Sequence, residues 1–423
     1  GILKCKNRSR ECQVLENLAL LEKLSFERIA GSKEEYRAAM IIKEEIEKMG
    51  LNATLEPFEI EFPEEVTATF EITAPQNQSF EVTGVGMAGV TKGLEAPFYY
   101  GQDLDEISLS QMKGKIVLFN GALRYDSYKK IIQAGAVGFI TFNGSVYDAE
   151  IEVEDRYLRP KLQELGKIPG VTMSIHDAQT LVRLNPTTVR LTVNAKESTR
   201  TSHNLVVTLP GDIEDEIICF SGHYDSVRHS KGVYDNATGA LAVLDFLKYF
   251  SQKKPKRTLK FLWLGTEERG LIGATQYVKA HQETIDQYKL NINLDMLGVV
   301  LGKDIACVTG EEAITHYIDF VAKELNFAIK TSTGVYPSDS TPFADGGVPA
   351  ITFARGAVVG GAQIHSKKDV IDFISIESFN QTVEFIQAFA SRVIEAEVCP
   401  IPSTMPKKML EELDDYLMRK IAE

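Results

Sequence analysis

The chain has 423 residues, of which 44% are hydrophobic and 25% are charged, as is typical of a globular protein and not of a disordered one. Its 46 basic and 59 acidic residues give a formal net charge of −13, which disfavours binding to nucleic acid or to an anionic membrane surface. No apolar stretch approaches the ~20 residues of a membrane-spanning helix, so we expect no membrane span.

The first fifty residues are predicted to be helical. Leucines recur there at helical spacing, at Leu15, Leu18, Leu21 and Leu24. A second helix is expected to begin at Ser32, because Ser32 and Glu35 have the spacing of a capping box, and to end at Gly50.

Residues 64–193 have a different sequence pattern, in which short strand-like runs are separated by turns. Strands are expected at 67–73, 80–85, 115–119, 137–142, 171–175 and 189–193, with two short helices near 127–134 and 178–184. At about 150 residues per domain, the length predicts two to three domains, or one large domain with an insert. We therefore predict a β-rich insert at 64–193 within a domain made of 1–63 and 194–423.

After residue 203 the pattern is that of an α/β fold. Apolar strands at 217–220, 259–264, 292–294 and 350–353 alternate with helices near 238–251, 271–281, 313–325 and 376–396. Strands without polar alternation indicate a mostly parallel central sheet flanked by helices on both faces. The tail after Pro406 is predicted to be an amphipathic helix that docks on its own domain by Leu410, Leu413, Leu417 and Ile421.

Acidic residues and histidines follow these strands. His223 and Asp225 come after the first strand, and their spacing of two puts both side chains on one side of an extended backbone. Glu267 and Glu268 follow the second strand, and Asp295 follows the third. In open parallel sheets such strand ends meet at the edge where ligands bind.

Two further candidates complete the set. Asp235 stands just before a helix, where an ordinary N-cap is the alternative interpretation, and His365 follows a glycine-rich loop. Imidazole and carboxylate ligands suit zinc, and a bridging carboxylate can hold two metal ions about 3.5–4 Å apart. The pattern as a whole favours a metal-dependent hydrolase.

The motifs H-Y-D, G-x-x-D-N-x-x-G, T-E-E-x-G-x-x-G-A, N-L-D-M and a late I-H resemble those of the co-catalytic di-zinc aminopeptidase family. That family includes glutamate-carboxypeptidase-like and glutaminyl-cyclase-like members. The resemblance covers most of 203–395 and the segment 28–32, and it implies a zinc exopeptidase fold. The insert resembles a protease-associated domain at 114–118, 133–138 and 168–171.

The resemblance implies a ligand set for two zinc ions per chain. His223 and Asp295 would hold one ion, Glu268 and His365 the other, and Asp235 would bridge them. The peptide bond from Asp235 to Asn236 is expected to be cis.

The resemblance also implies an aminopeptidase mechanism acting on peptide or protein N-termini. Metal-bound water would attack the scissile carbonyl with Glu267 as the general base, while Asp225 would orient His223. Tyr336 would donate a hydrogen bond to the oxyanion. The residues after Asp339 are Ser340 and Thr341, where some relatives have His, which weakens the match around Tyr336.

Three alternatives remain open. A glutamate-carboxypeptidase-like enzyme needs arginines that converge on a substrate carboxylate, and Arg228, Arg269 and Arg355 do not form an obvious cluster. Cyclisation of N-terminal glutamine is disfavoured because such relatives generally lack the insert. A receptor-like binding protein on the same fold is disfavoured because all the ligand positions are retained.

The insert is expected to bind partners or to restrict access to peptide ends, and homo-oligomerisation is left open.

Cysteine usage does not indicate a disulfide-built scaffold, since there are five cysteines in the chain. Cys219 and Cys307 lie in strand-like runs and are expected to be buried free thiols. Cys5, Cys12 and Cys399 are compatible with one bridge in an oxidising compartment. The chain begins with Gly1 rather than Met, which indicates either processing or an artificial start, and the resemblance to a protease-associated domain favours secretion; the compartment is otherwise left open.

Overall fold

The computed structural model describes residues 2–419, and residues 2–9 by their backbone alone. The chain forms two compact units, one of Gly1–Ile60 with Thr201–Glu423, called here the large unit, and the insert, Glu61–Arg200. The unit boundaries lie at 60/61 and 200/201, against 63/64 and 193/194 expected from the sequence. Two long strands, β1 (Thr54–Ala74) and β8 (Thr188–Leu209), run through these boundaries and pair with each other.

A mixed sheet forms the centre of the large unit, in the order β13-β12-β14-β11-β9-β10-β8. The four pairs β10–β9, β11–β9, β11–β14 and β12–β13 are parallel, whereas β12–β14 and β10–β8 are antiparallel. The α/β fold with a mostly parallel central sheet is therefore confirmed. The strands are β9 (Ile213–His223), β10 (Arg257–Leu264), β11 (Tyr288–Leu294), β12 (Gly302–Thr309), β13 (Lys330–Thr333) and β14 (Ala350–Ala357).

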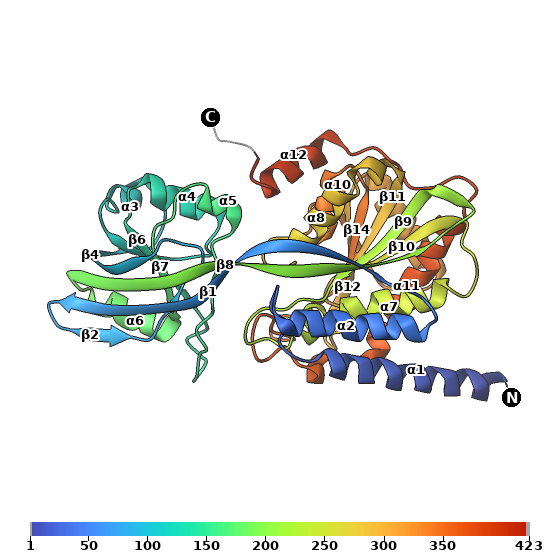
Figure 1. Cartoon of the computed structure of the whole chain (residues 1–423), viewed down its shortest axis with the longest axis horizontal. Helices are drawn as coiled ribbons and strands as arrows, with labels where there is room; N and C mark the ends of the chain where they lie inside the picture. The colour runs from blue at the N-terminus through green and yellow to red at the C-terminus, as the bar shows by residue number, and fades with distance from the viewer. Residues whose placement is uncertain (1, 420–423) are drawn as a thin grey trace. The chain divides into compact units, whose positions relative to one another are not determined.

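Helices cover both faces of this sheet (Figure 1). Phe220 and Phe261 pack on one face with Phe246 of α7, in the cluster that also includes α1, α2, α9 and α11. The neighbouring positions, Cys219 and Leu262, pack on the other face with α8 and α10. Because successive strand side chains point to opposite faces, burial on both sides explains the unbroken apolar runs. The helices are α1 (Ile2–Leu24), α2 (Lys33–Lys48), α7 (Thr238–Phe250), α8 (Ile272–Ala280), α9 (Glu312–Glu324), α10 (Ser340–Asp345), α11 (Ile376–Glu395) and α12 (Lys407–Tyr416), with 3₁₀ turns at Gln282–Gln287 and Ile371–Phe373.

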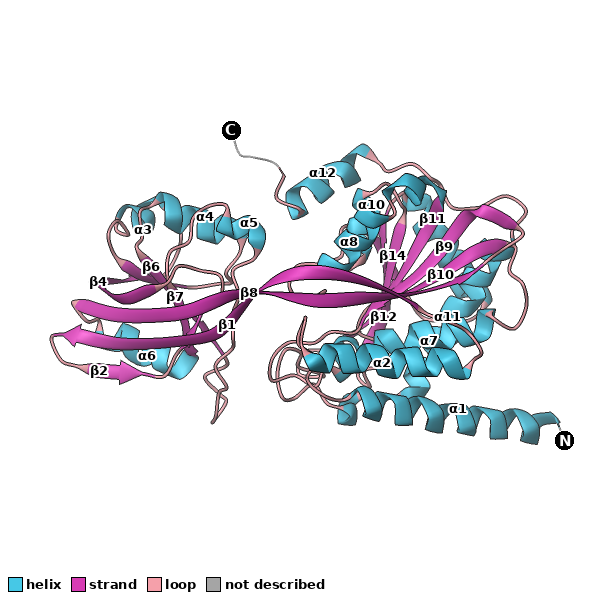
Figure 2. Cartoon of the chain, in the orientation of Figure 1, coloured by secondary structure: helices cyan, strands magenta, loops and turns pink. Residues whose placement is uncertain are grey.

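The insert has its own sheet and core (Figure 2). Its strands follow the order β8-β4-β5-β6-β7-β3, and β4 to β7 are parallel to one another. The bounds are β2 (Gln78–Phe80), β3 (Thr83–Gly84), β4 (Thr91–Gly101), β5 (Ile116–Phe119), β6 (Gly138–Asn143), β7 (Gly170–Ser174), α3 (Glu106–Ser110), α4 (Tyr125–Gln133), α5 (Pro160–Gln163) and α6 (Ile175–Leu184).

The two helices expected in the insert correspond to α4 and α6. The sequence interpretation missed α3 and α5, which are too short to show a helical period. It also missed β4, which contains Gly93 and Pro97, two residues that usually interrupt strands.

The C-terminal helix α12 docks on the large unit as expected, through the predicted Leu413 but with Met409 in place of Leu410. Its buried residues are Met409 and Leu413, which pack against Ala344 and Ala350. Leu410 is 48% exposed, so its assignment to the docking face was wrong. Ile421 lies outside the described residues.

The other global expectations concern the membrane and the cysteines. Within residues 2–419, no helix has the length and apolar character to cross a membrane. Cys219 and Cys307 are buried free thiols, as predicted. Cys12 and Cys399 are also unbridged, whereas the side chain of Cys5 lies outside the described residues.

A buried carboxyl group outside the sheet predicts a pH effect on stability. Asp245 of α7 accepts a hydrogen bond of 3.0 Å from Asn17 of α1, and Asn17 also donates to Asn380 of α11 (3.1 Å). Burial raises the pKa of Asp245 to about 7, an effect that Glu16 adds to and that Asn17 and Lys248 oppose. In the unfolded chain this group titrates near 4.

Between about pH 4 and pH 7 the unfolded state is ionised at Asp245 while the folded state stays protonated, so stability falls as pH rises and levels off above pH 7. We expect Asp245→Asn to remove this component, worth up to about 4 kcal/mol of unfolding free energy. Urea unfolding at pH 5 and pH 7.5 measures about 2.5 kcal/mol of this component, with Asp286→Asn as an exposed control. Equal pH dependence in wild type and Asp245→Asn would contradict the assignment.

Candidate metal centre

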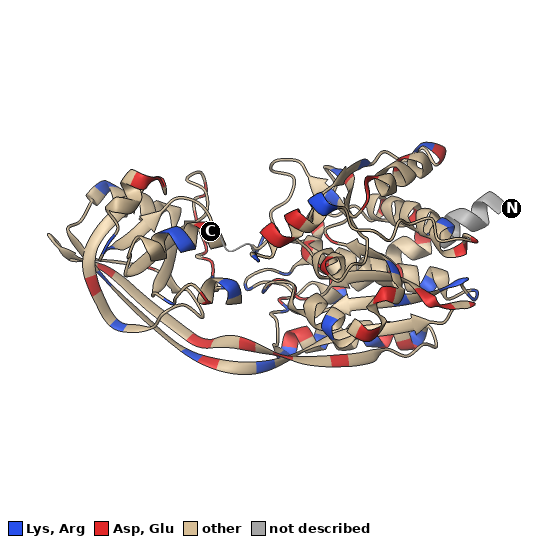
Figure 3. Ribbon diagram, turned by 90° about the horizontal axis from the view of Figure 1, so that it is seen from above, with Lys and Arg blue, Asp and Glu red and all other residues tan. Residues whose placement is uncertain are grey.

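The predicted site residues come together where the parallel strands of the large unit end. The register of β9 and β10 pairs His223 with Leu264, so His223 ends its strand beside the turn that carries Glu267 and Glu268. Asp295 directly follows β11, which is the neighbour of β9 on its other side. Along the part of the chain that the structure describes, acidic and basic residues are interspersed on the ribbon (Figure 3), whereas several carboxylates lie close together at this strand edge.

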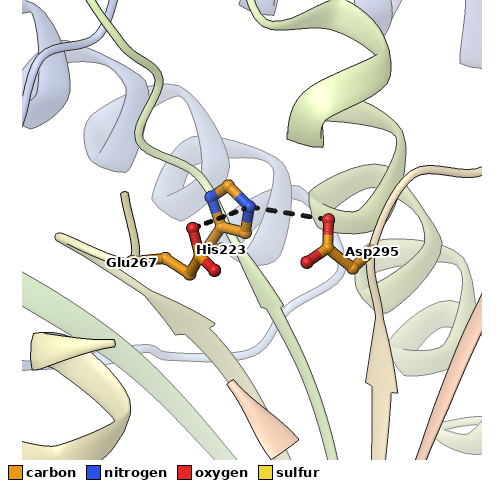
Figure 4. Close-up of side chains that lie close together, drawn as sticks. All are labelled: His223, Glu267 and Asp295. Atoms are coloured by element: carbon orange, nitrogen blue, oxygen red, sulfur yellow. Dashed lines mark ion pairs between the residues drawn. The ribbon is translucent and has the colours of Figure 1, made fainter. Parts of the chain in front are cut away.

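The imidazole of His223 is the centre of one group (Figure 4). Its Nε2 atom lies 3.2 Å from Asp235 Oδ1, 3.6 Å from Glu267 Oε2 and 3.7 Å from Asp295 Oδ1. Its other nitrogen, Nδ1, lies 3.2 Å from Asp225 Oδ1. Nε2 of His223 therefore faces Asp235, Glu267 and Asp295, while Asp225 holds the opposite side of the ring at Nδ1.

A second group forms around His365. Its Nε2 atom lies 3.0 Å from Asp235 Oδ2 and 3.0 Å from Glu268 Oε2. Asp235 thus directs one carboxylate oxygen towards each histidine. This is the arrangement that a bridging carboxylate between two cations requires.

The donor atoms fit divalent cations. His223 Nε2 and Asp295 Oδ1 are buried and have no hydrogen-bond partner. Two atoms that each lie 2.0–2.2 Å from one zinc ion in tetrahedral geometry are about 3.4 Å apart, close to the separations around His223 Nε2. Two overlapping sets, His223 with Glu267 and Asp295 and His223 with Asp235 and Glu268, have ligand atoms close enough to share an ion.

Burial and mutual repulsion shift the pKa values of this cluster. Burial raises the pKa of Glu268 to about 7, with a further increase from Asp235, and burial raises the pKa of Glu267 well above its usual range. Burial alone would lower the pKa of His365, but Asp235 and Glu268 outweigh it and raise that pKa to about 11. In the same way burial would raise the pKa of Asp235, yet His223 and His365 lower it. A metal ion replaces such protons when it binds.

Asp225 supports the site from a buried position. Its Oδ1 accepts the backbone N–H of Glu267 (3.0 Å) and its Oδ2 accepts that of Glu268 (3.1 Å). The same carboxylate therefore orients both the His223 ring and the loop with the two glutamates.

Asp235 is held by groups that the sequence interpretation missed. Asp369, four residues after His365, accepts the N–H groups of Tyr234 (2.7 Å) and Asp235 (3.0 Å). The Asn236 side chain donates to Leu294 O (2.8 Å) and accepts from Met296 N (3.0 Å), which ties this segment to the end of β11. The peptide bond between Asp235 and Asn236 is cis, as expected from the resemblance.

Three more buried residues near the site were not predicted. Arg28 is fully buried and donates to the carbonyl oxygens of Tyr224 (2.6 Å) and Gly232 (2.9 Å), which fixes the loop between His223 and Asp235. Ser338 donates to Asp295 Oδ2 at 2.5 Å. Both carboxylate oxygens of Asp339 are buried without a hydrogen-bond partner. The N-terminal motif that contains Arg28 was noticed in the sequence, but its contacts span about 200 residues and have no local signal.

Tyr336 precedes Ser338 in the same loop and is half-buried. Burial raises the pKa of its hydroxyl, and the charges of Asp295 and Asp235 raise it further. The tyrosine is therefore within electrostatic range of the cluster.

Comparisons with known proteins agree with the fold and with the family resemblance. Residues 204–390 match the model of Peptidase family M28. Aminopeptidase YwaD of Bacillus subtilis (strain 168) is 26% identical over 404 residues, covering 92% of this chain and 85% of the relative. Carboxypeptidase Q of Homo sapiens is 27% identical over 314 residues, covering 69% of this chain and 65% of the relative.

Two solved structures are similar over nearly the whole chain. A zinc aminopeptidase from Bacillus subtilis superposes with a TM-score of 0.76 at 23% identity, covering 94% of this chain and 98% of that one. The aminopeptidase from Aneurinibacillus sp. strain AM-1 gives a TM-score of 0.74 at 22% identity, covering 92% and 96%. The resemblance stated from the sequence motifs is confirmed, and so is the fold class.

Proposed function

Because the chain is related to Peptidase family M28 through residues 204–390, we propose that it is a di-zinc metallo-exopeptidase that removes N-terminal residues from peptides. The observation that carries this proposal is the position of Asp235, whose two carboxylate oxygens lie 3.2 Å and 3.0 Å from the imidazoles of His223 and His365. His223 and Asp295 would hold one zinc ion and Glu268 and His365 the other, with Asp235 shared.

When bound, zinc supplies a Lewis acid that polarises the scissile carbonyl and makes water more acidic. The carboxylate of Glu267 takes a proton from the attacking water. Asp225 holds the Glu267 N–H and so orients the loop that carries this carboxylate. The new C–O bond forms, the peptide C–N bond breaks, and Glu267 returns the proton to the leaving amine. The Tyr336 hydroxyl donates a hydrogen bond to the carbonyl oxygen as that oxygen gains negative charge.

The charge of the site favours binding of a peptide's N-terminal ammonium group over its C-terminal carboxylate. Acidic side chains outnumber basic ones there, since Asp225, Asp235, Glu267, Glu268, Asp295 and Asp339 gather around His223 and His365, and such surroundings favour an ammonium group over a carboxylate. Arg28, the buried arginine beside them, donates to backbone carbonyl oxygens and is not directed to a substrate carboxylate. This supports an aminopeptidase over a carboxypeptidase.

We propose that the insert is a protease-associated domain that binds partners or restricts access to peptide ends. Its resemblance to such domains at 114–118, 133–138 and 168–171 supports this proposal. Its compact separate core supports an independent role.

The function is tested with amino-acyl p-nitroanilides beside their N-acetylated forms. We expect hydrolysis of the free-amine substrates alone, its loss on chelation, and its return when two equivalents of zinc are added. Release of C-terminal residues from N-acetylated peptides would indicate a carboxypeptidase. No hydrolysis of either class by protein with two bound zinc ions would indicate a binding role.

A further inference from the structure

Glu35 is a buried carboxyl group that touches three separate segments of the large unit. It is 1% exposed although it lies in the first turn of α2. Its Oε1 accepts the N–H of Gly31 (3.0 Å) and the hydroxyl of Ser202 (2.7 Å). Its Oε2 accepts the N–H of Thr266 at 3.2 Å.

The contact with Thr266 completes a pattern along the loop that contains the proposed general base. The N–H groups of Thr266, Glu267 and Glu268 are consecutive, and each is accepted by a carboxylate oxygen, the first by Glu35 and the next two by Asp225. Two buried carboxyl groups therefore hold every backbone donor of this three-residue segment.

The conformation of Thr266 needs such support. Its φ angle is +55°, in the left-handed region that a β-branched residue rarely adopts. The residue before Thr266 is fixed as well, because the Gly265 N–H donates to Asn204 Oδ1 at 3.0 Å. The position of Glu267, three residues after the end of β10, thus depends on side chains from outside the loop.

Capping of helix α2 does not account for Glu35. In a capping box the glutamate at this position returns to the N–H of the N-cap residue, but Ser32 N–H donates to Ile29 O instead. An exposed glutamate would cap the helix without the desolvation that Glu35 bears. Burial, with the nearby charge of Asp225, raises the pKa of Glu35 to about 8.

We propose that Glu35 is a positioning residue, which fixes the loop 266–268 through the Thr266 N–H and so sets the place of the Glu267 carboxylate. This inference depends on the proposed function only in the role of Glu267 as general base. The anchoring itself is a property of the folded chain.

The kinetic test compares Glu35→Ala with Glu34→Ala, its exposed neighbour on the same helix. We expect Glu35→Ala to lower kcat on an amino-acyl p-nitroanilide by about 10- to 100-fold, because small displacements of catalytic groups have such effects. KM and zinc content should stay within about twofold of wild type, since Glu35 itself contacts neither substrate nor metal and Asp225 still holds the N–H of the proposed ligand Glu268. Glu34→Ala should match wild type in all three measurements.

The second measurement does not depend on activity. Amide hydrogen exchange of a peptide that spans 265–270, in the zinc-loaded protein, should be at least about tenfold faster in Glu35→Ala and unchanged in Glu34→Ala. If Glu35→Ala does not fold, Glu35→Asp replaces it, because the shorter acid keeps the carboxyl group but withdraws it from Thr266. We then expect smaller changes in the same directions.

Wild-type kcat together with wild-type exchange in the Glu35 variant would overturn the inference. Faster exchange with full kcat would also overturn it, since the loop would be loosened without effect on Glu267. If wild-type protein hydrolyses no substrate, the proposed function fails, and the exchange experiment alone still decides whether Glu35 anchors the loop.

Discussion

Replacing Glu267 by glutamine is expected to lower kcat for amino-acyl p-nitroanilide hydrolysis by about 10²- to 10⁴-fold, the range attributed to a positioned general base. The amide has nearly the same shape but cannot accept and return a proton. Its backbone N–H keeps the hydrogen bond to Asp225, so the loop should stay in place. KM is expected to change by no more than a few fold.

Zinc content and thermal melting distinguish a chemical defect from a structural one. Glu267→Gln should retain two zinc ions, because the proposed ligands are other residues, and should melt near the wild-type temperature. Glu283→Gln, an exposed glutamate of the large unit, serves as the control. An active Glu267→Gln would remove Glu267 from the mechanism.

Replacing Asp235 by alanine should have the largest effect on metal binding. This side chain faces both histidines, so its loss removes a ligand from each proposed ion at once. Loss of a residue that merely supports a ligand typically costs 10- to 100-fold in affinity or activity. We expect losing the bridge itself to lower activity by roughly 10³-fold or more.

Metal analysis after dialysis measures the stoichiometry for the Asp235 variant. We expect fewer than two zinc ions per chain, against two for wild type and for Asp212→Ala, an exposed control. Two tightly bound ions in Asp235→Ala would show that the carboxylate does not bridge them.

The sequence predicted the components of this site whose signal is local. Glu267, Glu268 and Asp295 directly follow apolar strands, and parallel pairing brings such strand ends together. His223 and His365 were predicted as ligands from the motifs around them. The structure assembles all five of the proposed ligands.

The supporting contacts could not be predicted, because they join segments that are distant in the chain. Asp369 holds Asp235 across 134 residues, and Arg28 reaches Gly232 across 204. The capping-box spacing of Ser32 and Glu35 correctly predicted the start of α2, but not that Glu35 turns to Thr266 across 231 residues. Side-chain direction at such positions is decided by tertiary packing, which has no period in the sequence.

The same distances have a consequence for how the protein is made. The insert separates residues 1–60 from residues 201–423, so Arg28 and Glu35 leave the ribosome long before Gly232 and Thr266. At 5–20 residues per second, some 200 residues of synthesis delay these contacts by roughly 10–40 s. Closing a flexible loop as long as the 140-residue insert costs on the order of 4 kcal/mol.

We expect folding of the insert to lower this loop-closure cost. The pairing of β1 with β8 holds the two ends of the insert together in the folded chain. Substitutions that slow the folding of the insert are therefore expected to slow the maturation of the metal centre.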